Sequence, residues 1–227
     1  MISFMENNPD SPKCARQHRL ALIIILSVLV IDQIIKIKVK TGMSLGESID
    51  VTSWFKILFV ENNGMAFGME IIGKLFLSLF RIGAIGFFTW YLIKILDKGF
   101  PTGYIVTVSF VIAGAIGNLL DCMFYGLIFT ESTPFDQAVM TSVGEGYAPF
   151  LYGKVVDMFY FPLWTWPDWM PLVGGDIFFG PVFNFADSCI TCGVIALLLF
   201  YTKVVNMGLH YSNPGEPEKT ESADEKD

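Results

Sequence analysis

The sequence predicts an all-α membrane protein with four transmembrane helices, a small β-rich element outside the membrane and an extended outer loop. Of its 227 residues, 53% are hydrophobic and only 16% are charged, whereas soluble domains carry about 25% charged residues. The charged residues gather at the two ends and in a few short stretches, which leaves long apolar runs between them. Since a helix needs about 20 apolar residues to cross a bilayer, these runs predict one membrane-embedded bundle.

Four apolar runs have the length that crossing requires. They are residues 20–39, 72–96, 103–125 and 182–205. The bundle domain therefore covers about 20–206, with outer loops at about 40–71 and 126–181.

The two outer loops differ in their local patterns. In the first loop, residues 54–60 are rich in aromatic and branched side chains and break at the turn-forming residues 61–64, which predicts a short surface strand. In the second loop, prolines interrupt the apolar segments 151–166 and 177–185. We expect these segments to be loops or to lie at the membrane interface rather than to span it.

Basic residues indicate which side is cytoplasmic. The leader, residues 1–19, carries Lys13, Arg16 and Arg19, and the short loop after the second span carries Lys94 and Lys98. Positive charge favours the cytoplasmic side, so both termini are expected there and both large loops outside. The tail, residues 207–227, is polar and acidic and is predicted to be disordered.

Several classes of function are disfavoured. The net charge is −7 and no basic patch is interleaved with aromatic residues, which argues against nucleic-acid binding. The two histidines, His18 and His210, lie in the termini, so a Ser/His triad or a histidine-rich metal site on the outer face is not expected. Cys189 and Cys192 lie in an apolar run, where they are interpreted as small helix residues. No cofactor is expected.

Polar side chains within or beside the apolar runs are the candidates for function, because such groups are costly in a membrane. Those expected near the outer face are Asp32, Lys36, Asn118, Asp121, Asp157, Asn184 and Asp187. Asp32 and Lys36 are four residues apart and fit a helix-end ion pair at least as well as a chemical role.

Two neighbouring carboxyl groups can hydrolyse a peptide bond. The ionised one takes a proton from water, and the protonated one donates to the scissile carbonyl oxygen. A half-dry setting raises the pKa of one member, so the pair shares a proton near neutral pH. From spacing alone, Asp187 pairs with Asp121 as well as with Asp157. The alternative function is a non-enzymatic transporter or scaffold that uses the buried acids for ions or protons.

Five motifs resemble those of the lipoprotein signal peptidases (signal peptidase II), and they occur in the family's order over about four-fifths of the chain. They are Asp32-Gln33 with Lys36, Asn62-Asn63-Gly64-Met65-Ala66-Phe67, Gly114-Ala115-Ile116-Gly117-Asn118-Leu119-Leu120-Asp121, Val155-Val156-Asp157-Met158 and Phe183-Asn184-Phe185-Ala186-Asp187-Ser188. Each motif by itself is weak evidence of the resemblance, but five motifs in the family's order are specific evidence.

The resemblance implies a monomeric, multi-pass aspartic endopeptidase of the bacterial inner membrane, with its active site on the outer face. Its partners would be membrane lipids and diacylglyceryl-modified prolipoproteins, which it would cleave before the lipidated cysteine. The implied catalytic pair is Asp157 and Asp187. The implied substrate-binding residues are Asn62, Gly64, Asn118 and Asn184. The supporting residues are Asp32, Lys36, Asp121 and Arg81.

The chain departs from the family pattern in three places. Cys122 follows the motif aspartate where the family usually has arginine, and we hypothesise that Arg81 supplies this charge from the second span. The alternatives are that Arg81 pairs with Asp32 or reaches the interface. Residues 127–153 form an insertion that is either a lid over the site or solvated padding. The segment 159–181 is also long.

Overall fold

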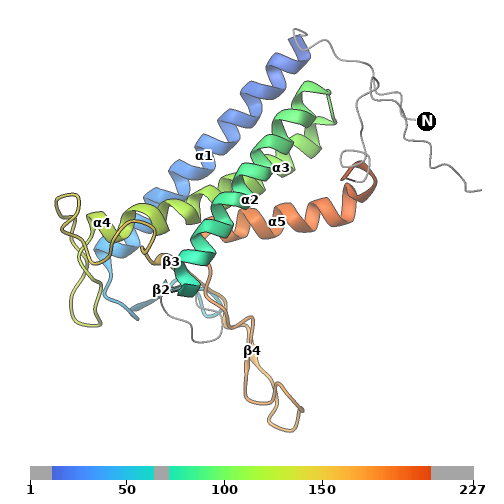
Figure 1. The fold of residues 1–227 in the computed structure, drawn as a ribbon. Helices are drawn as coiled ribbons and strands as arrows, with labels where there is room; N and C mark the ends of the chain where they lie inside the picture. The colour runs from blue at the N-terminus through green and yellow to red at the C-terminus, as the bar shows by residue number, and fades with distance from the viewer. Residues whose placement is uncertain (1–11, 64–71, 206–227) are drawn as a thin grey trace, which may run out of the picture.

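The computed structural model describes residues 12–63 and 72–205, and helices dominate it (Figure 1). The long helices are α1 (Pro12–Gly42), α2 (Ile72–Asp97), α3 (Thr102–Leu120) and α5 (Phe185–Phe200). After α3, the chain continues through the π-helical turn η1 (Asp121–Tyr125) into the short α4 (Gly126–Ile128). Helix α1 begins within the predicted leader, so part of residues 1–19 belongs to the first helix.

In the described part of the chain, three helices are long and apolar enough to cross a membrane. They are Pro12–Gly42, Lys74–Asp97 and Thr102–Ile128. The predicted fourth span, 182–205, is not confirmed, because α5 has 16 residues and would cover about 24 Å, less than the hydrocarbon core of about 30 Å. Asn184 caps its start after Pro181, and Tyr201 leaves helical geometry at its end.

Helix α3 is the centre of the bundle and contacts α1, α2 and α5. Its glycines permit this. A Cβ atom on Gly114 would collide with the Ala186 carbonyl oxygen of α5, and one on Gly117 would lie 2.7 Å from a carboxylate oxygen of Asp32 on α1. The small residues of the third span therefore bring the polar side chains of three helices together.

A three-stranded antiparallel sheet lies at one end of the bundle (Figure 1). Its order is β1 (Ser48–Asp50), β2 (Lys56–Asn62) and β3 (Val155–Tyr160). The strand predicted at 54–60 is confirmed as β2, shifted by two residues. Asp157, predicted to lie in a loop, lies instead in β3, opposite Val60. The prediction missed this strand because Val155–Tyr160 is short, and only its pairing with β2 distinguishes it from an apolar loop.

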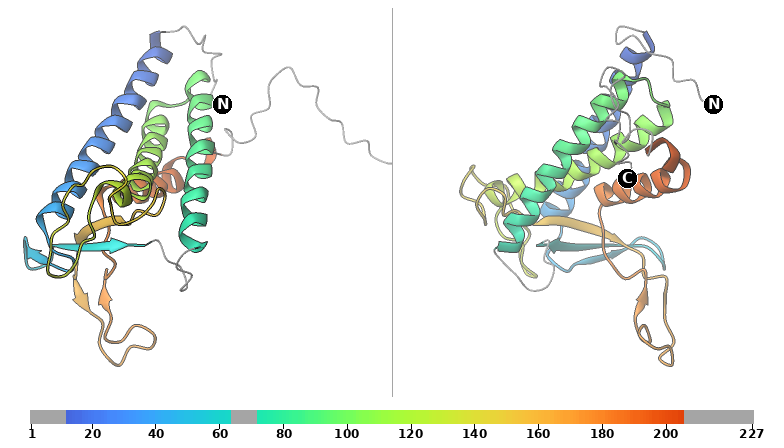
Figure 2. Two further views of the ribbon diagram at one scale, coloured as in Figure 1. Left: turned by 60° about the vertical axis from the view of Figure 1, so that its left-hand side comes forward. Right: turned by 45° about the vertical axis from the view of Figure 1, so that its right-hand side comes forward.

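The two unusual outer segments adopt different structures. Residues 127–153 are mostly irregular, but Phe129 and Ala138 are buried and pack with Phe59 and Met158 in the core beneath the sheet. The insertion is thus anchored in the core at these two residues, while most of its residues between 131 and 150 are exposed. The second segment forms the hairpin of β4 (Trp164–Thr165) and β5 (Ile177–Phe178), which projects away from the helices (Figure 2).

Candidate active site

A buried lysine joins the polar groups of α1 and α3. Lys36 Nζ lies 3.0 Å from Asp32 Oδ2 and 2.8 Å from Asp121 Oδ2, and all three side chains are inaccessible to solvent. Lys36 also donates to Asn118 Oδ1 at 2.8 Å. One ammonium group thus faces two carboxylates. Asp32 and Lys36 do form the ion pair that one interpretation of the sequence proposed, but it is buried and includes Asp121 as a third member.

The carboxylate oxygens of this ion cluster also accept hydrogen bonds from other groups of the chain. Gln33 Nε2 donates to Asp121 Oδ1 at 2.9 Å. The backbone N–H of Ala186 donates to Asp32 Oδ1 at 3.0 Å, and that of Val156 donates to Asp121 Oδ2 at 3.3 Å. Asp32 and Asp121 therefore hold the start of α5 and strand β3 against the bundle.

Asp157 and Asp187 form a second pair with amide neighbours. Asn184 Nδ2 donates to Asp157 Oδ1 at 2.6 Å, and Asn118 Nδ2 donates to Asp187 Oδ1 at 2.7 Å. Asn184 Nδ2 also lies 3.0 Å from Asn118 Oδ1. In the described residues, no lysine or arginine is within ion-pair distance of either carboxyl group.

The Asn184-x-x-Asp187 spacing is the reason that Asp187 is fixed in place. Asn184 is the N-cap of α5: its side chain accepts from the Asp187 N–H at 2.9 Å, and Asp187 Oδ2 accepts from the Asn184 N–H at 3.4 Å. This reciprocal capping box satisfies two backbone donors at the helix start. It also places the Asp187 carboxylate at the positive end of the helix dipole, which stabilises negative charge.

The surroundings of Asp157, in contrast, favour its protonated form. Burial, and secondly the nearby charge of Asp187, raise the pKa of Asp157 to about 7, although hydrogen bonds from Asn184 and Asn62 and the charge of Lys36 act in the other direction. Asp157 is only 3% exposed, whereas Asp187 is partly exposed. Near neutral pH, Asp157 can therefore carry a proton, as a general acid requires.

The structure brings together most of the residues that the sequence nominated. Asn62 and Asn184 hydrogen-bond with Asp157, and Asn118 donates to Asp187. Gly64 lies outside the described residues. Arg81 does not pair with Asp32: its Nη1 lies 3.1 Å from Cys122 Sγ, at the position where the family usually has arginine.

Sequence reasoning missed a second buried ion pair, between Lys40 and Glu61. The two side chains are joined by a hydrogen bond, and Ser132 from the insertion donates to Glu61 Oε1 at 2.8 Å. Burial alone would raise the pKa of Glu61, but Lys40, Ser132 and Lys154 together lower it. A usable signal was the position of Lys40, one helical turn after Lys36. The pair fixes β2 directly before Asn62.

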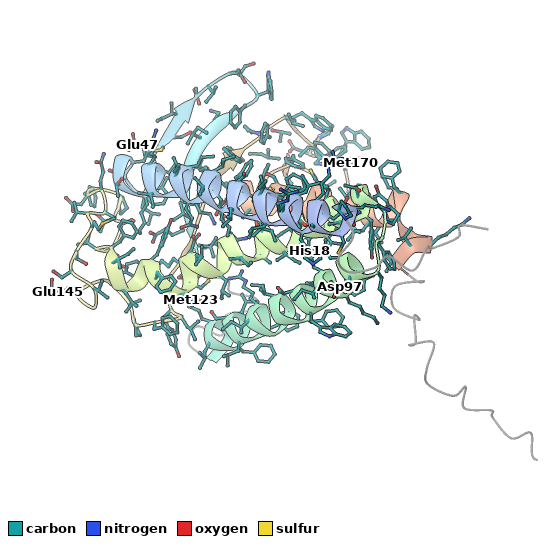
Figure 3. All side chains as sticks on the ribbon, turned by 90° about the horizontal axis from the view of Figure 1, so that it is seen from above. His18, Glu47, Asp97, Met123, Glu145 and Met170 are labelled. Atoms are coloured by element: carbon teal, nitrogen blue, oxygen red, sulfur yellow. The ribbon has the colours of Figure 1, made fainter. Side chains whose placement is uncertain are left out.

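A possible metal-binding group lies far from these residues. Cys14, His18 and Asp97 are the one Cys/His/acid group with ligand spacing among the residues described. His18 and Asp97 lie at the end of the bundle opposite Glu47 (Figure 3). The His18 ring sits between its partners, with Nδ1 3.5 Å from Cys14 Sγ and Nε2 3.5 Å from Asp97 Oδ1. One imidazole nitrogen thus faces each partner, which does not favour a single shared ion.

Comparisons with known proteins agree with the motifs. Residues 24–203 match the family described as signal peptidase (SPase) II. A lipoprotein signal peptidase of Porphyromonas gingivalis is 49% identical over 212 residues, covering 91% of this chain and 90% of the relative. Another, of Amoebophilus asiaticus, is 32% identical over 186 residues, covering 78% and 75%.

Solved structures show the same fold. A bacterial membrane enzyme determined by the in meso method at 1.9 Å resolution has a TM-score of 0.52 and 25% identity, covering 79% of this chain and 90% of that one. A second, at 2.3 Å resolution, has a TM-score of 0.54 and covers 87% and 94%. By its family match and its relatives, the chain belongs to the signal peptidase II family of membrane proteases.

Proposed function

We propose that this protease removes signal peptides from diacylglyceryl-modified prolipoproteins by cleaving before the lipidated cysteine, with Asp157 and Asp187 as its catalytic pair. The observation that carries this proposal is the separation of the four aspartates into two kinds. Lys36 forms ion pairs with Asp32 and Asp121, whereas asparagine amides donate hydrogen bonds to Asp157 and Asp187. The amides position these two carboxyl groups without placing a charge beside them.

The proposed mechanism assigns one role to each aspartate. Ionised Asp187 takes a proton from the attacking water, and protonated Asp157 donates to the carbonyl oxygen of the scissile bond. Asn118 and Asn184 hold the two carboxyl groups in register, since each is hydrogen-bonded to one of them and to the other amide. Asn62 and Gly64 are proposed to bind the substrate backbone with them.

The proposed setting is the outer face of the bacterial inner membrane. The basic residues of the leader and of the loop after α2 support cytoplasmic termini. The start of α1 and the end of α2 lie at one end of the bundle, and the sheet that carries Asp157 lies at the other (Figure 1). We propose that the chain acts as a monomer with four membrane segments, α5 being the short one. The relatives are peptidases and do not support a transporter.

The direct test is in vitro processing of a lipidated prolipoprotein by the purified full-length protein in detergent. Release of the signal peptide, with cleavage mapped to the bond before the lipidated cysteine, is the expected result. A reaction on the same precursor without its diacylglyceryl group is the control and should be far slower. A protein that is folded but leaves the lipidated precursor intact would contradict the proposal.

A further inference from the structure

Strands β2 and β3 change register by one residue at a bulge beside the proposed catalytic pair. Before the bulge, Ile57 lies opposite Phe159, and after it Val60 lies opposite Asp157. Without this shift, Val60 would lie opposite Val156 instead. Since successive side chains point to opposite faces of a sheet, a slip of one residue moves every side chain of a strand to the other face. The register after the bulge therefore decides which side chains of β2 share a face with Asp157.

The observed register gives the two strands a catalytic face and a core face. Asn62 lies opposite Val155, so it shares the face of Asp157, with which it hydrogen-bonds. Glu61 lies opposite Val156, which is fully buried, and so shares the core face. One residue of slip would exchange Asn62 and Glu61 between the faces. A carboxylate would then lie beside Asp157 in place of an amide.

The apolar residues of the two strands do not select between these registers. Strand β2 has four consecutive apolar residues, 57–60, and β3 has apolar residues on both sides of Asp157. A strand in which apolar and polar residues do not alternate has a weakly specified register. The selection therefore falls to polar side chains, and Glu61 is the one charged residue of β2 after the bulge.

Glu61 lies on the core face between two ammonium groups. Its side chain is 3% exposed and forms an ion pair with Lys40 of α1, which is fully buried. Its Oε2 lies 3.2 Å from Nζ of Lys154, the residue directly before β3. Ser132, from the insertion 127–153, donates to Glu61 Oε1 at 2.8 Å. A helix, the end of the neighbouring strand and the insertion thus all bind one carboxylate.

The insertion also contacts both cations. The ring centroid of Tyr147 is 5.0 Å from Lys40 Nζ and 5.3 Å from Lys154 Nζ, and its hydroxyl accepts from the Lys154 backbone N–H at 2.6 Å. Glu131 Oε1 lies 3.2 Å from Lys154 Nζ. A slip of β2 would take the Glu61 carboxylate away from these cations and leave Lys40 buried without its ion-pair partner, which is strongly unfavourable.

We infer that Glu61 is a positioning residue for the proposed catalytic acid. Its carboxylate selects the strand register that puts Asn62, rather than Glu61 itself, beside Asp157. The inference rests on the proposed function and adds a role for the insertion 127–153, which holds this carboxylate and its cations from the core side. Apolar side chains in place of the ion pair could fill the same space, but they could not select the register.

The test removes the ion pair without leaving a buried charge. Lys40→Met/Glu61→Leu replaces both charged side chains by apolar ones, a change that is often neutral for stability. Its melting temperature in detergent should stay near that of the parent. Its kcat on a lipidated precursor should fall about 10²-fold, the effect of misplacing a catalytic group by about 1 Å.

The matched control is another ion pair of the same sheet. Lys56 of β2 pairs with Asp50 of β1 at 2.9 Å, on the far side of the bulge from Asn62. This pair is partly exposed, so Lys56→Met/Asp50→Leu should keep both kcat and the melting temperature close to those of the parent.

A second measurement asks whether Glu61 acts through Asn62. In the parent, Asn62→Ala should lower kcat/KM about tenfold, because one hydrogen bond to a carboxyl group is lost. In the Lys40→Met/Glu61→Leu background the amide is already displaced, so the same substitution should cost less than about twofold. Such non-additivity identifies residues that act together. An ion pair that only stabilises the fold would leave the tenfold cost unchanged.

The outcomes separate this inference from the proposed function. Full kcat in a Lys40→Met/Glu61→Leu protein that melts like the parent would overturn this inference alone, and so would an unchanged cost of Asn62→Ala. A parent protein that leaves the lipidated precursor intact would overturn the proposed function, and this inference with it.

If the double variant melts far below the parent, Ser132→Ala replaces it. This variant keeps both charges and loses one hydrogen bond to Glu61, so kcat should fall about fivefold, the effect of about one hydrogen bond. A Ser132→Ala protein with the kcat of the parent would again count against the inference.

Discussion

The two pairs of aspartates differ in what surrounds them, although all four lie within one small region. Asp32 and Asp121 share the ammonium group of Lys36 and are fully buried. Asp157 and Asp187 receive hydrogen bonds from asparagine amides, and Asp187 is partly exposed. The first pair thus has a cation between its members, whereas the hydrogen-bond partners of the second pair are uncharged amides. Residue type alone therefore does not distinguish the four aspartates, whereas their partners do.

The most severe test of this comparison is to remove one carboxyl group from each pair. Asp157→Asn and Asp187→Asn should each lower kcat at least about 10³-fold, because the acid or the base is lost. Asp121→Asn leaves Lys36 paired with Asp32, so its effect should appear mainly in stability. Turnover of a lipidated precursor and thermal melting in detergent measure the two effects. If Asp121→Asn abolished kcat in a protein that melts like the parent, the division of roles would be wrong.

The ion cluster can be tested through its lysine. Lys36→Met leaves two buried carboxylates without their cation, a change that costs about 3–5 kcal/mol in comparable buried pairs. The free energy of unfolding, measured by denaturant titration in mixed micelles, should fall accordingly. Lys56→Met is the control, since Lys56 pairs with Asp50 at the surface, where an ion pair contributes about 0–1 kcal/mol. Equal losses in the two variants would contradict the view that Lys36 is structural.

The pH dependence of activity and stability tests the proton-donor role of Asp157. Because burial and the Asp187 charge raise its pKa to about 7, kcat/KM should fall as the pH rises through about 7 and the proton donor is lost. The folded protein also binds this proton more tightly than the unfolded chain, where the pKa is about 4. Stability should therefore fall as the pH rises from about 4 to 7.

Asp157→Asn provides the check on this pH effect. It should flatten the pH dependence of the melting temperature between about pH 4 and 7, because the titrating group is gone. A melting curve series that is unchanged by Asp157→Asn would show that another group titrates in this window.

The smallest expected effect concerns Arg81. Its contact with Cys122 places a guanidinium beside the residue that follows Asp121, so Arg81→Leu should lose about 1–3 kcal/mol of stability or a comparable part of the activity. Thr89→Leu, at an exposed position on the same helix, is the control for a more apolar α2. An Arg81→Leu enzyme that melts and turns over like the parent would remove Arg81 from the supporting residues.

Much of the site was predictable because its residues belong to short sequence patterns that specify local structure. The Asn184-x-x-Asp187 spacing is a capping box, which forms wherever a helix starts at that point. Gly114 and Gly117 precede Asn118 and so allow the close helix contacts that orient its amide. The strand at 54–60 was visible from its branched and aromatic residues.

Long-range packing determined the rest. Spacing along the chain could not tell Asp121 from Asp157 as the proposed partner of Asp187. The difference between them is that Lys36, on another helix, forms an ion pair with Asp121. The same holds for Asp157, whose strand exists only because β2 pairs with it.

By itself, the sequence determined which segments are apolar helices and which polar residues must be buried, because hydrophobic length and helix caps are local properties of the chain. Only the tertiary structure decided which of those polar residues form ion pairs or hydrogen bonds with one another. Charge neutralisation and burial depend on atoms that are far apart in sequence, and no pattern along the chain records them.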